Sequence, residues 1–127
     1  MVGIDVVENA IRKNEVDSLP WSSWRGMPSP ENCKSINGPE NSGVYQIREI
    51  QNKKNIQFGI GKNCQERMKS LFPKPHGTGT RNNEFKRKHI LDNWRVLEYR
   101  TLATENRIVA KLVEDFLKGK KDHLFNT

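Results

Sequence analysis

Two short apolar segments near the middle of the chain flank a polar stretch, and this pattern predicts a β-hairpin. The first segment runs from Val44 to Ile50 and the second from Ile56 to Ile60, with residues 51 to 55 between them. Side chains alternate between the two faces of a strand, so each face of the second segment can be predicted. One face should carry Ile56, Phe58 and Ile60, and the other Gln57 and Gly59.

A short helix is predicted directly after the hairpin. Asn63 suits its N-terminal cap and Glu66 its reciprocal partner, while Pro73 ends it. The buried stripe of this helix should consist of Cys64, Met68 and Leu71. A second, basic helix is predicted over residues 82 to 91.

The last third of the chain predicts one strand and one long helix. Residues Trp94 to Tyr99 alternate as a strand does. Thr104 and Glu105 then open a strongly amphipathic helix that Gly119 is expected to stop. The residues expected to face inward are Ile108, Val109, Leu112, Val113, Phe116 and Leu117.

The element order predicts a small α/β domain of the α+β kind, with about three antiparallel strands flanked by helices over residues 43–127. Residues 1–42 are predicted to form an extension packed on this domain. The extension begins with an amphipathic helix over Ile4 to Val16, followed by a proline-rich stretch over Leu19 to Glu40 with little regular structure. Trp21 and Trp24 should pin that stretch to the domain surface.

Composition limits the function classes. The chain has 127 residues and a net charge of +7. Residues 1–42 carry four basic and six acidic side chains, so the remainder carries +9, which suits a polyanionic partner. No apolar run is long enough for a membrane span, and no secretory leader is recognisable. We expect a cytoplasmic protein in which Cys33 and Cys64 are free, buried thiols.

Several motifs occur in an order that resembles the GIY-YIG nuclease family. Gly43-Val44-Tyr45 and Gln57-Phe58-Gly59 stand on the two hairpin strands, and Arg67 follows Gly59 by the family's eight residues. Glu114 lies on the late helix, and Asn126 stands beyond that helix. The resemblance covers roughly residues 43–127, and it depends on order and spacing because each single motif is loose.

The resemblance implies an endonuclease that hydrolyses DNA phosphodiester bonds with Mg²⁺ or Mn²⁺. Glu114 would be the metal ligand, and Arg67 would contact the phosphate with its planar fork. Tyr45 would accept or orient the proton of the attacking water, which requires a lowered phenol pKa. Asn126 would position the end of the Glu114 helix or the cleft wall.

The chain also departs from the family pattern. Gln57 occupies the position of the second motif's tyrosine, Leu71 stands where relatives often have Tyr or His, and His123 replaces the usual proline. His76, in a loop with two nearby glycines, is a candidate replacement for the missing proton-transfer partner, with a solvated loop histidine as the alternative.

Basic side chains on both sides of the loop predicted over Pro73 to Thr80 are candidates for a surface that binds double-stranded or branched DNA. They are Lys62, Lys69, Arg81, Lys86, Arg87 and Lys88. An ordinary solvated helix face would equally explain the basic run Lys86-Arg87-Lys88. Two alternatives to the enzyme stay open: a cleavage-impaired nucleic-acid-binding module, and a protein-interaction domain that uses Trp21 and Trp24. Oligomeric state stays open too, because a second subunit is one potential source of specificity.

Overall fold

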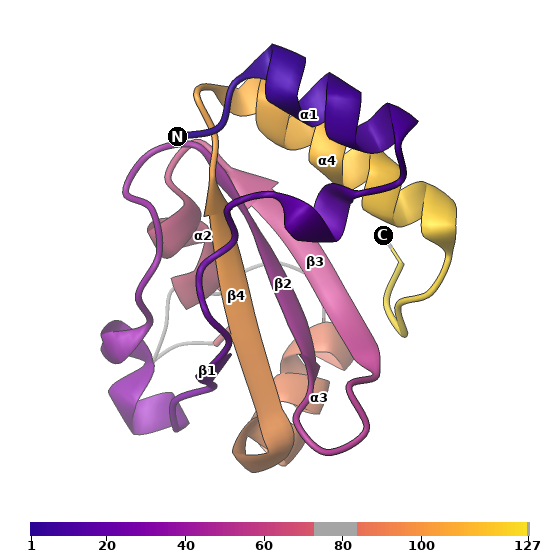
Figure 1. Cartoon of the computed structure of the whole chain (residues 1–127). Helices are drawn as coiled ribbons and strands as arrows, with labels where there is room; N and C mark the ends of the chain where they lie inside the picture. The colour runs from indigo at the N-terminus through magenta and orange to yellow at the C-terminus, as the bar shows by residue number, and fades with distance from the viewer. Residues whose placement is uncertain (73–83, 127) are drawn as a thin grey trace.

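The computed structural model describes residues 1–72 and 84–126, which form one antiparallel sheet with helices on both faces (Figure 1). The strands lie in the order β1-β4-β2-β3. They comprise β1 (Arg25–Gly26), β2 (Gly43–Glu49), β3 (Asn55–Gly61) and β4 (Leu97–Ala103). The α+β class and the β2–β3 hairpin are therefore confirmed, and the two-residue β1 adds a fourth strand to the three predicted.

Each face of the sheet has its own hydrophobic core. Helices α1 (Ile4–Arg12) and α4 (Arg107–Lys120) lie side by side over one face and pack on residues such as Val44 and Leu102. Helices α2 (Cys64–Lys69) and α3 (Glu84–Asn93) belong to the opposite side, together with the 3₁₀ helix η2 (Pro30–Ser35). Tyr45 is part of that second core.

A β-bulge corrects the predicted alternation in the second hairpin strand. Ile47 pairs with Gln57, but its neighbour Arg48 pairs with Asn55, so Ile56 is an extra residue in β3. The bulge turns Ile56 into the core on the α2 side, while Phe58 packs under α4. The two side chains were expected on one face, and strict alternation fails because one residue is inserted.

Helix α2 begins as predicted. The side-chain oxygen of Asn63 accepts a hydrogen bond from the backbone N–H of Glu66 at 3.0 Å. The carboxylate of Glu66 does not complete a reciprocal box, because it pairs with Lys69 at 3.1 Å instead. The predicted stripe of Cys64, Met68 and Leu71 is buried, and Cys33 and Cys64 are both free.

The predicted boundaries of the last strand and helix need correction. Residues Trp94–Val96 form a 3₁₀ helix, η3, and β4 starts only at Leu97. Helix α4 is capped by Asn106, whose side chain accepts from Val109 N–H, so the predicted start at Thr104 and Glu105 was too early. Ile108 is 69% exposed, contrary to prediction: its neighbours Val109 and Ala110 are buried in the same turn, and Ile108 lies on the helix face that lines the groove described below.

The C-terminal end of α4 also differs from the prediction. Gly119 lies inside the helix, and the residue in the left-handed conformation is Lys121, with φ 54°. A glycine near the end of an amphipathic run is the usual stop signal, but here the helix continues to Lys120, and the carbonyl of Lys118 accepts a hydrogen bond from the Asn126 side chain. Leu117 is the last buried residue of the helix.

The N-terminal extension packs on the domain as predicted, but its helix is shorter. Helix α1 ends at Arg12, and Val16 is buried in a separate 3₁₀ helix, η1 (Val16–Ser18). The indole N–H of Trp21 donates to the carbonyl of Val16 at 2.9 Å, and the guanidinium of Arg100 lies 4.1 Å from the Trp21 ring centroid. Among the described helices, none combines the length and apolar character that a membrane span needs.

Candidate functional site

A groove of about 680 Å³ runs along the free edge of β3. The C-terminal segment covers the first part of this edge, because the backbone N–H groups of Leu124 and Phe125 donate to the carbonyls of Asn55 and Ile56. The groove begins beyond this cover. It is lined by Phe58, Gly59, Ile60, Arg67, Lys86, Arg107, Ile108, Lys111, Leu112 and Glu114.

The charged side chains of the groove come from three helices. Helix α4 supplies Arg107, Lys111 and Glu114, whereas α2 supplies Arg67 and α3 supplies Lys86. Four cations thus surround one carboxylate, and they lie against low-dielectric protein walls. Such a groove attracts anions, because walls of low dielectric concentrate the field of the charges that line them.

Glu114 lies at the edge of the apolar arc of α4, as the helical periodicity predicted. Its side chain is 17% exposed, while Val113 and Leu117 beside it are buried. A carboxylate oxygen of Glu114 accepts a hydrogen bond from the ammonium group of Lys111 at 3.0 Å. The same ammonium group lies 3.2 Å from Asp115.

Arg67 reaches the groove from the other side of the strand. An ideal Cβ added at Gly61 would lie 2.9 Å from the Cβ of Arg67, so the glycine permits the close approach of α2 to β3. A terminal nitrogen of Arg67 donates to the hydroxyl of Ser70 at 2.7 Å. Among the described residues, Ser70 is the partner that its fork binds, and the guanidinium is near enough to influence the pKa values of Tyr45 and Lys86.

Tyr45 lies beneath the groove and is almost fully buried. A Cβ added at Gly59 would come within 2.5 Å of the Tyr45 hydroxyl, so only glycine fits opposite the ring. Burial raises the pKa of Tyr45 to about 12, against a smaller lowering by Arg67. This direction is opposite to the lowered pKa that the proposed proton acceptor requires, because the charge of Arg67 does not offset the loss of hydration.

Gln57 does not line the groove. It is 1% exposed, and its amide nitrogen has no hydrogen-bond partner among the described residues. Asn126 lies at the end of α4, where its side-chain amide donates to the carbonyl of Lys118 at 2.8 Å. That contact matches the first of the two positions expected for Asn126.

The predicted DNA-binding residues are spread over different environments. Lys86 lines the groove, and desolvation followed by the charge of Arg67 lowers its pKa. Lys69 pairs with Glu66 and Lys88 with Asp92, while Lys62 is exposed and Arg87 is half-buried. Arg81 and His76 lie outside the described residues.

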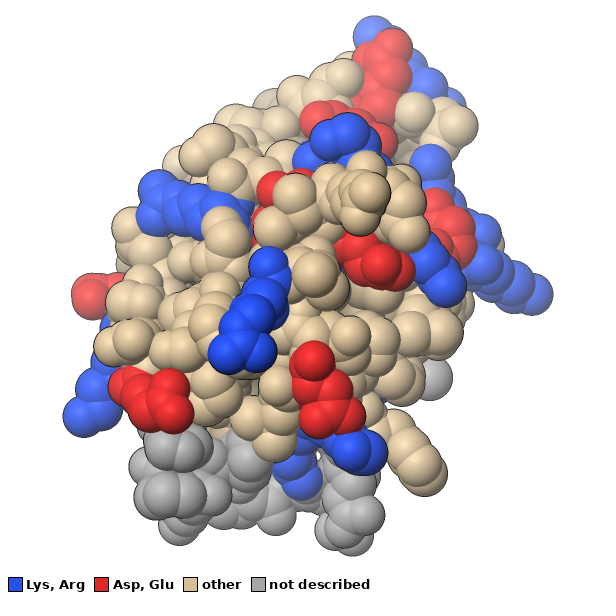
Figure 2. Space-filling view, turned by 90° about the horizontal axis from the view of Figure 1, so that it is seen from below, with Lys and Arg blue, Asp and Glu red and all other residues tan. Residues whose placement is uncertain are grey.

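Figure 2 shows the molecule from below, where Lys and Arg side chains alternate with Asp and Glu. The described residues on this face form no continuous basic surface. In the groove, by contrast, the described lining has four basic side chains and one acidic side chain. Two of the cations there, Arg107 and Lys111, were missed by the sequence analysis, although they precede Glu114 by seven and three residues and so share its helix face.

The donor set of the groove fits a divalent cation whose other ligands are waters and, in the complex, a bound phosphate. Glu114 is the one carboxylate that lines it, and no group of three or more His, Cys, Asp or Glu side chains in the described part of the chain is arranged as a metal site. Mg²⁺ in proteins is commonly held by one or two carboxylates, with waters and substrate phosphates as the other ligands. A single carboxylate beside phosphate-binding cations meets that description.

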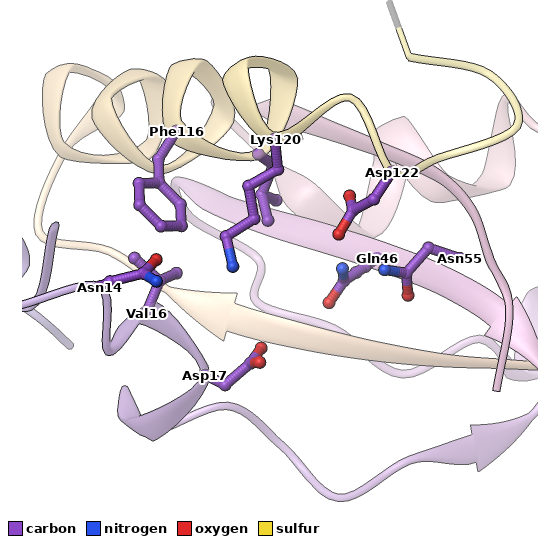
Figure 3. A pocket seen from close by; sticks show the side chains of 9 residues that line it. Asn14, Val16, Asp17, Gln46, Asn55, Phe116, Lys120 and Asp122 are labelled. Carbon is purple, nitrogen blue, oxygen red and sulfur yellow. The ribbon is translucent and has the colours of Figure 1, made fainter.

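A second, smaller pocket of about 40 Å³ lies between α4 and η1, on the face of the sheet that α1 and α4 cover (Figure 3). Side chains that include Asp17, Gln46, Lys120 and Asp122 surround it. Arg100 donates from Nε to the Gln46 carbonyl oxygen at 2.9 Å, so the amide nitrogen of Gln46 faces Nε2 of His123 at 3.0 Å. This pocket has room for little more than water, so the groove is the stronger candidate.

The chain was compared with protein families, curated proteins and solved structures. No protein-family model matches the chain, and neither does any curated protein or any solved structure.

Proposed function

We propose that this protein is a divalent-metal-dependent endonuclease that hydrolyses DNA phosphodiester bonds in the groove along β3. The observation that carries the proposal is that Arg67 and Glu114, on helices at opposite sides of the strand, line the same groove. Both residues had been selected by their place in the chain alone. Their convergence supports a phosphate-binding centre built on rigid elements.

Each need of phosphodiester hydrolysis has a candidate in the groove. Arg67 presents donors to the charge that develops on the phosphoryl oxygens, where such donors contribute most. Glu114 would hold Mg²⁺ or Mn²⁺ together with the substrate phosphate. The bound cation would stabilise negative charge and lower the pKa of a coordinated water. Lys86 and Arg107 would hold the flanking phosphates.

Tyr45 has a revised role in this proposal. With a pKa of about 12 its phenol is protonated at neutral pH, so it would not accept a proton; packed against Gly59, it would shape the floor of the groove. The charges near the attacking water would then come from Arg67 and Glu114. Tyr45→Phe would therefore slow cleavage less than removal of either charged residue.

A cleavage-impaired nucleic-acid-binding module is the second candidate. Three observations favour it: Tyr45 is buried, Gln57 is turned into the core, and Glu114 is already paired with Lys111. The same four cations would bind a nucleic-acid backbone without any chemistry. The two candidates share a ligand and differ only in whether the bond is broken.

A plasmid-nicking assay with Mg²⁺, Mn²⁺ or EDTA tests the proposal. Wild type should relax supercoiled DNA with either metal and not with EDTA. Glu114→Gln should lose at least about 100-fold in rate, and Arg67→Ala about as much, because each removes charge stabilisation in the transition state. Arg67→Lys should rescue poorly, since lysine lacks the planar fork.

Asp115→Asn is the matched control, because Asp115 is a carboxylate on the same helix that does not line the groove. It should keep wild-type cleavage, and thermal unfolding should show all variants folded. DNA binding without cleavage by wild type would support the binding module. Normal cleavage by Glu114→Gln would refute the metal-dependent site.

A further inference from the structure

Lys111 is a cation of the groove whose ammonium group contacts Glu114, the proposed metal ligand. Its ammonium group donates to Glu114 at 3.0 Å and lies 3.2 Å from Asp115. The Lys111 side chain is 52% exposed, whereas that of Glu114 is 17% exposed. The hydrogen bonds to Glu114 and then Asp115 raise the pKa of Lys111, so the ammonium group is charged at any neutral pH.

The position of this ammonium group is the position that a metal cation would need. Lys111 contacts Oε1 of Glu114, so a cation bound to this carboxylate would lie within a few ångström of the ammonium group. Two cations on one carboxylate repel each other, and among the described residues Glu114 is the single carboxylate that lines the groove. The ammonium group of Lys111 therefore opposes binding of a divalent cation as long as it keeps this contact.

We infer that Lys111 exchanges partners during the reaction: it neutralises Glu114 in the free protein and moves to a substrate phosphate when the metal takes the carboxylate. This inference rests on the proposed function of the groove. It adds a phosphate-contacting residue. It also predicts that cation and phosphate bind cooperatively, since each favours the binding of the other.

The geometry of the pair permits such an exchange at low cost. An exposed ion pair contributes little to stability, because water and salt screen it. Lysine has a long, flexible stem with a compact charge, so its ammonium group can swing within the groove while the helix stays fixed. Arg107 lies on the same face of α4 as Lys111, so it extends the row of cations toward the start of the helix.

Binding of Mn²⁺ to the free protein, measured by electron paramagnetic resonance, tests the first half of the exchange. Lys111→Gln should bind Mn²⁺ roughly three- to tenfold more tightly than wild type, because a unit charge is removed within a few ångström of the site. Lys120→Gln is the matched control. Lys120 lies on the same helix over the ring of Phe116, outside the groove, and its variant should bind Mn²⁺ as wild type does.

The double variant Lys111→Gln/Glu114→Gln separates the two carboxylates that Lys111 contacts. The gain in Mn²⁺ affinity should vanish in it, because the ligand is gone. Persistence of the gain would assign the released cation site to Asp115 and overturn the inference. Equal Mn²⁺ affinity of wild type and Lys111→Gln, or no measurable binding by Lys111→Gln, would overturn it as well.

DNA binding, followed by fluorescence anisotropy over a range of KCl concentrations, tests the second half. With Ca²⁺ present, Lys111→Gln should reduce the slope of log affinity against log salt by about 0.9, which is one phosphate contact. With EDTA the slope should equal that of wild type, because Lys111 is then held by Glu114. A slope change of the same size in both conditions would make Lys111 a permanent phosphate contact and refute the exchange.

Mn²⁺ binding by Glu114→Gln tests the proposed metal site separately from the exchange of partners by Lys111. If Glu114→Gln binds Mn²⁺ as wild type does, the metal site itself is wrong. If Glu114→Gln loses Mn²⁺ while Lys111→Gln changes nothing, only the exchange is wrong.

Discussion

Gln46 and Gln57 are buried glutamines on adjacent strands with opposite hydrogen-bonding states. The side chain of Gln46 is bonded on both sides, by Arg100 and by His123. The amide nitrogen of Gln57 has no partner within the described structure. An unpaired buried donor loses its bond to water without compensation, so Gln57 weakens the fold that Gln46 stabilises.

Methionine substitutions at the two positions should therefore have opposite effects. Gln57→Met keeps the length of the side chain and should raise the free energy of unfolding by about 1 kcal/mol. Gln46→Met should lower it by about 2–3 kcal/mol, because the charged Arg100 loses an acceptor. Urea denaturation of the two variants measures both changes. A loss of stability in Gln57→Met would mean that its amide has a partner in solution.

The helices and strands were predictable where they depend on local sequence, and helix α4 shows both the success and the failure. Its amphipathic run was predicted from the sequence, and so was the cap of α2, because both depend on local periodicity and local hydrogen bonds. The end of α4 was misplaced, since the helix runs past Gly119 to Lys120 and its last turn is bonded by Asn126, a contact that local sequence does not reveal. The bulge at Ile56 escaped prediction for the same reason, because register depends on the partner strand.

The corrected end of α4 predicts how two substitutions act. Gly119 lies in the exposed helix interior with no atom near an added Cβ, so Gly119→Ala should stabilise the protein by about 0.5–1 kcal/mol. Lys121 has φ 54°, so Lys121→Gly should stabilise it by about 1 kcal/mol. Thermal unfolding measures both. If Gly119 were the true stop, Gly119→Ala would be destabilising instead.

The candidate site could be predicted in part. Arg67 and Glu114 were found by their order and spacing along the chain, and the structure brings them to one groove. The pKa of Tyr45 was not predictable, because it depends on burial against Gly59 on the neighbouring strand. Lys111 was overlooked because a lysine on a helix face is common, and only its contact with Glu114 distinguishes it.

At the scale of the whole molecule, the two ends of the chain meet over one face of the sheet. Arg100 on β4 bonds both Asp17 from the N-terminal extension, at 2.7 Å, and Gln46 from β2. Gln46 in turn reaches His123, which packs edge-on against Phe58. Nδ1 of His123 lies 2.9 Å from an oxygen of Asp122 without the alignment of a hydrogen bond. This chain of polar groups connects both termini to the central strands.

The direction of these hydrogen bonds keeps His123 neutral. Arg100 can only donate, so the Gln46 amide must donate to Nε2 of His123, and that nitrogen cannot carry a proton. Burial lowers the pKa of His123; the charge of Asp122 opposes this effect and that of Arg100 adds to it. The unfolded chain, with a histidine pKa of about 6.5, then binds the proton more readily than the folded protein.

Stability should therefore fall as the pH decreases below about 6.5, and the contribution of His123 should be complete above that pH. His123→Gln should reduce the slope of unfolding free energy against pH in this range by up to about 1.4 kcal/mol per pH unit. Urea titrations between pH 5.5 and 8 measure the slope. His89 also has a pKa lowered by burial, so His89→Gln serves as a reference for a histidine outside the chain of polar groups. If His123→Gln kept the wild-type slope, the proton would be accommodated in the folded state, and the Arg100–Gln46–His123 order of donors would be wrong.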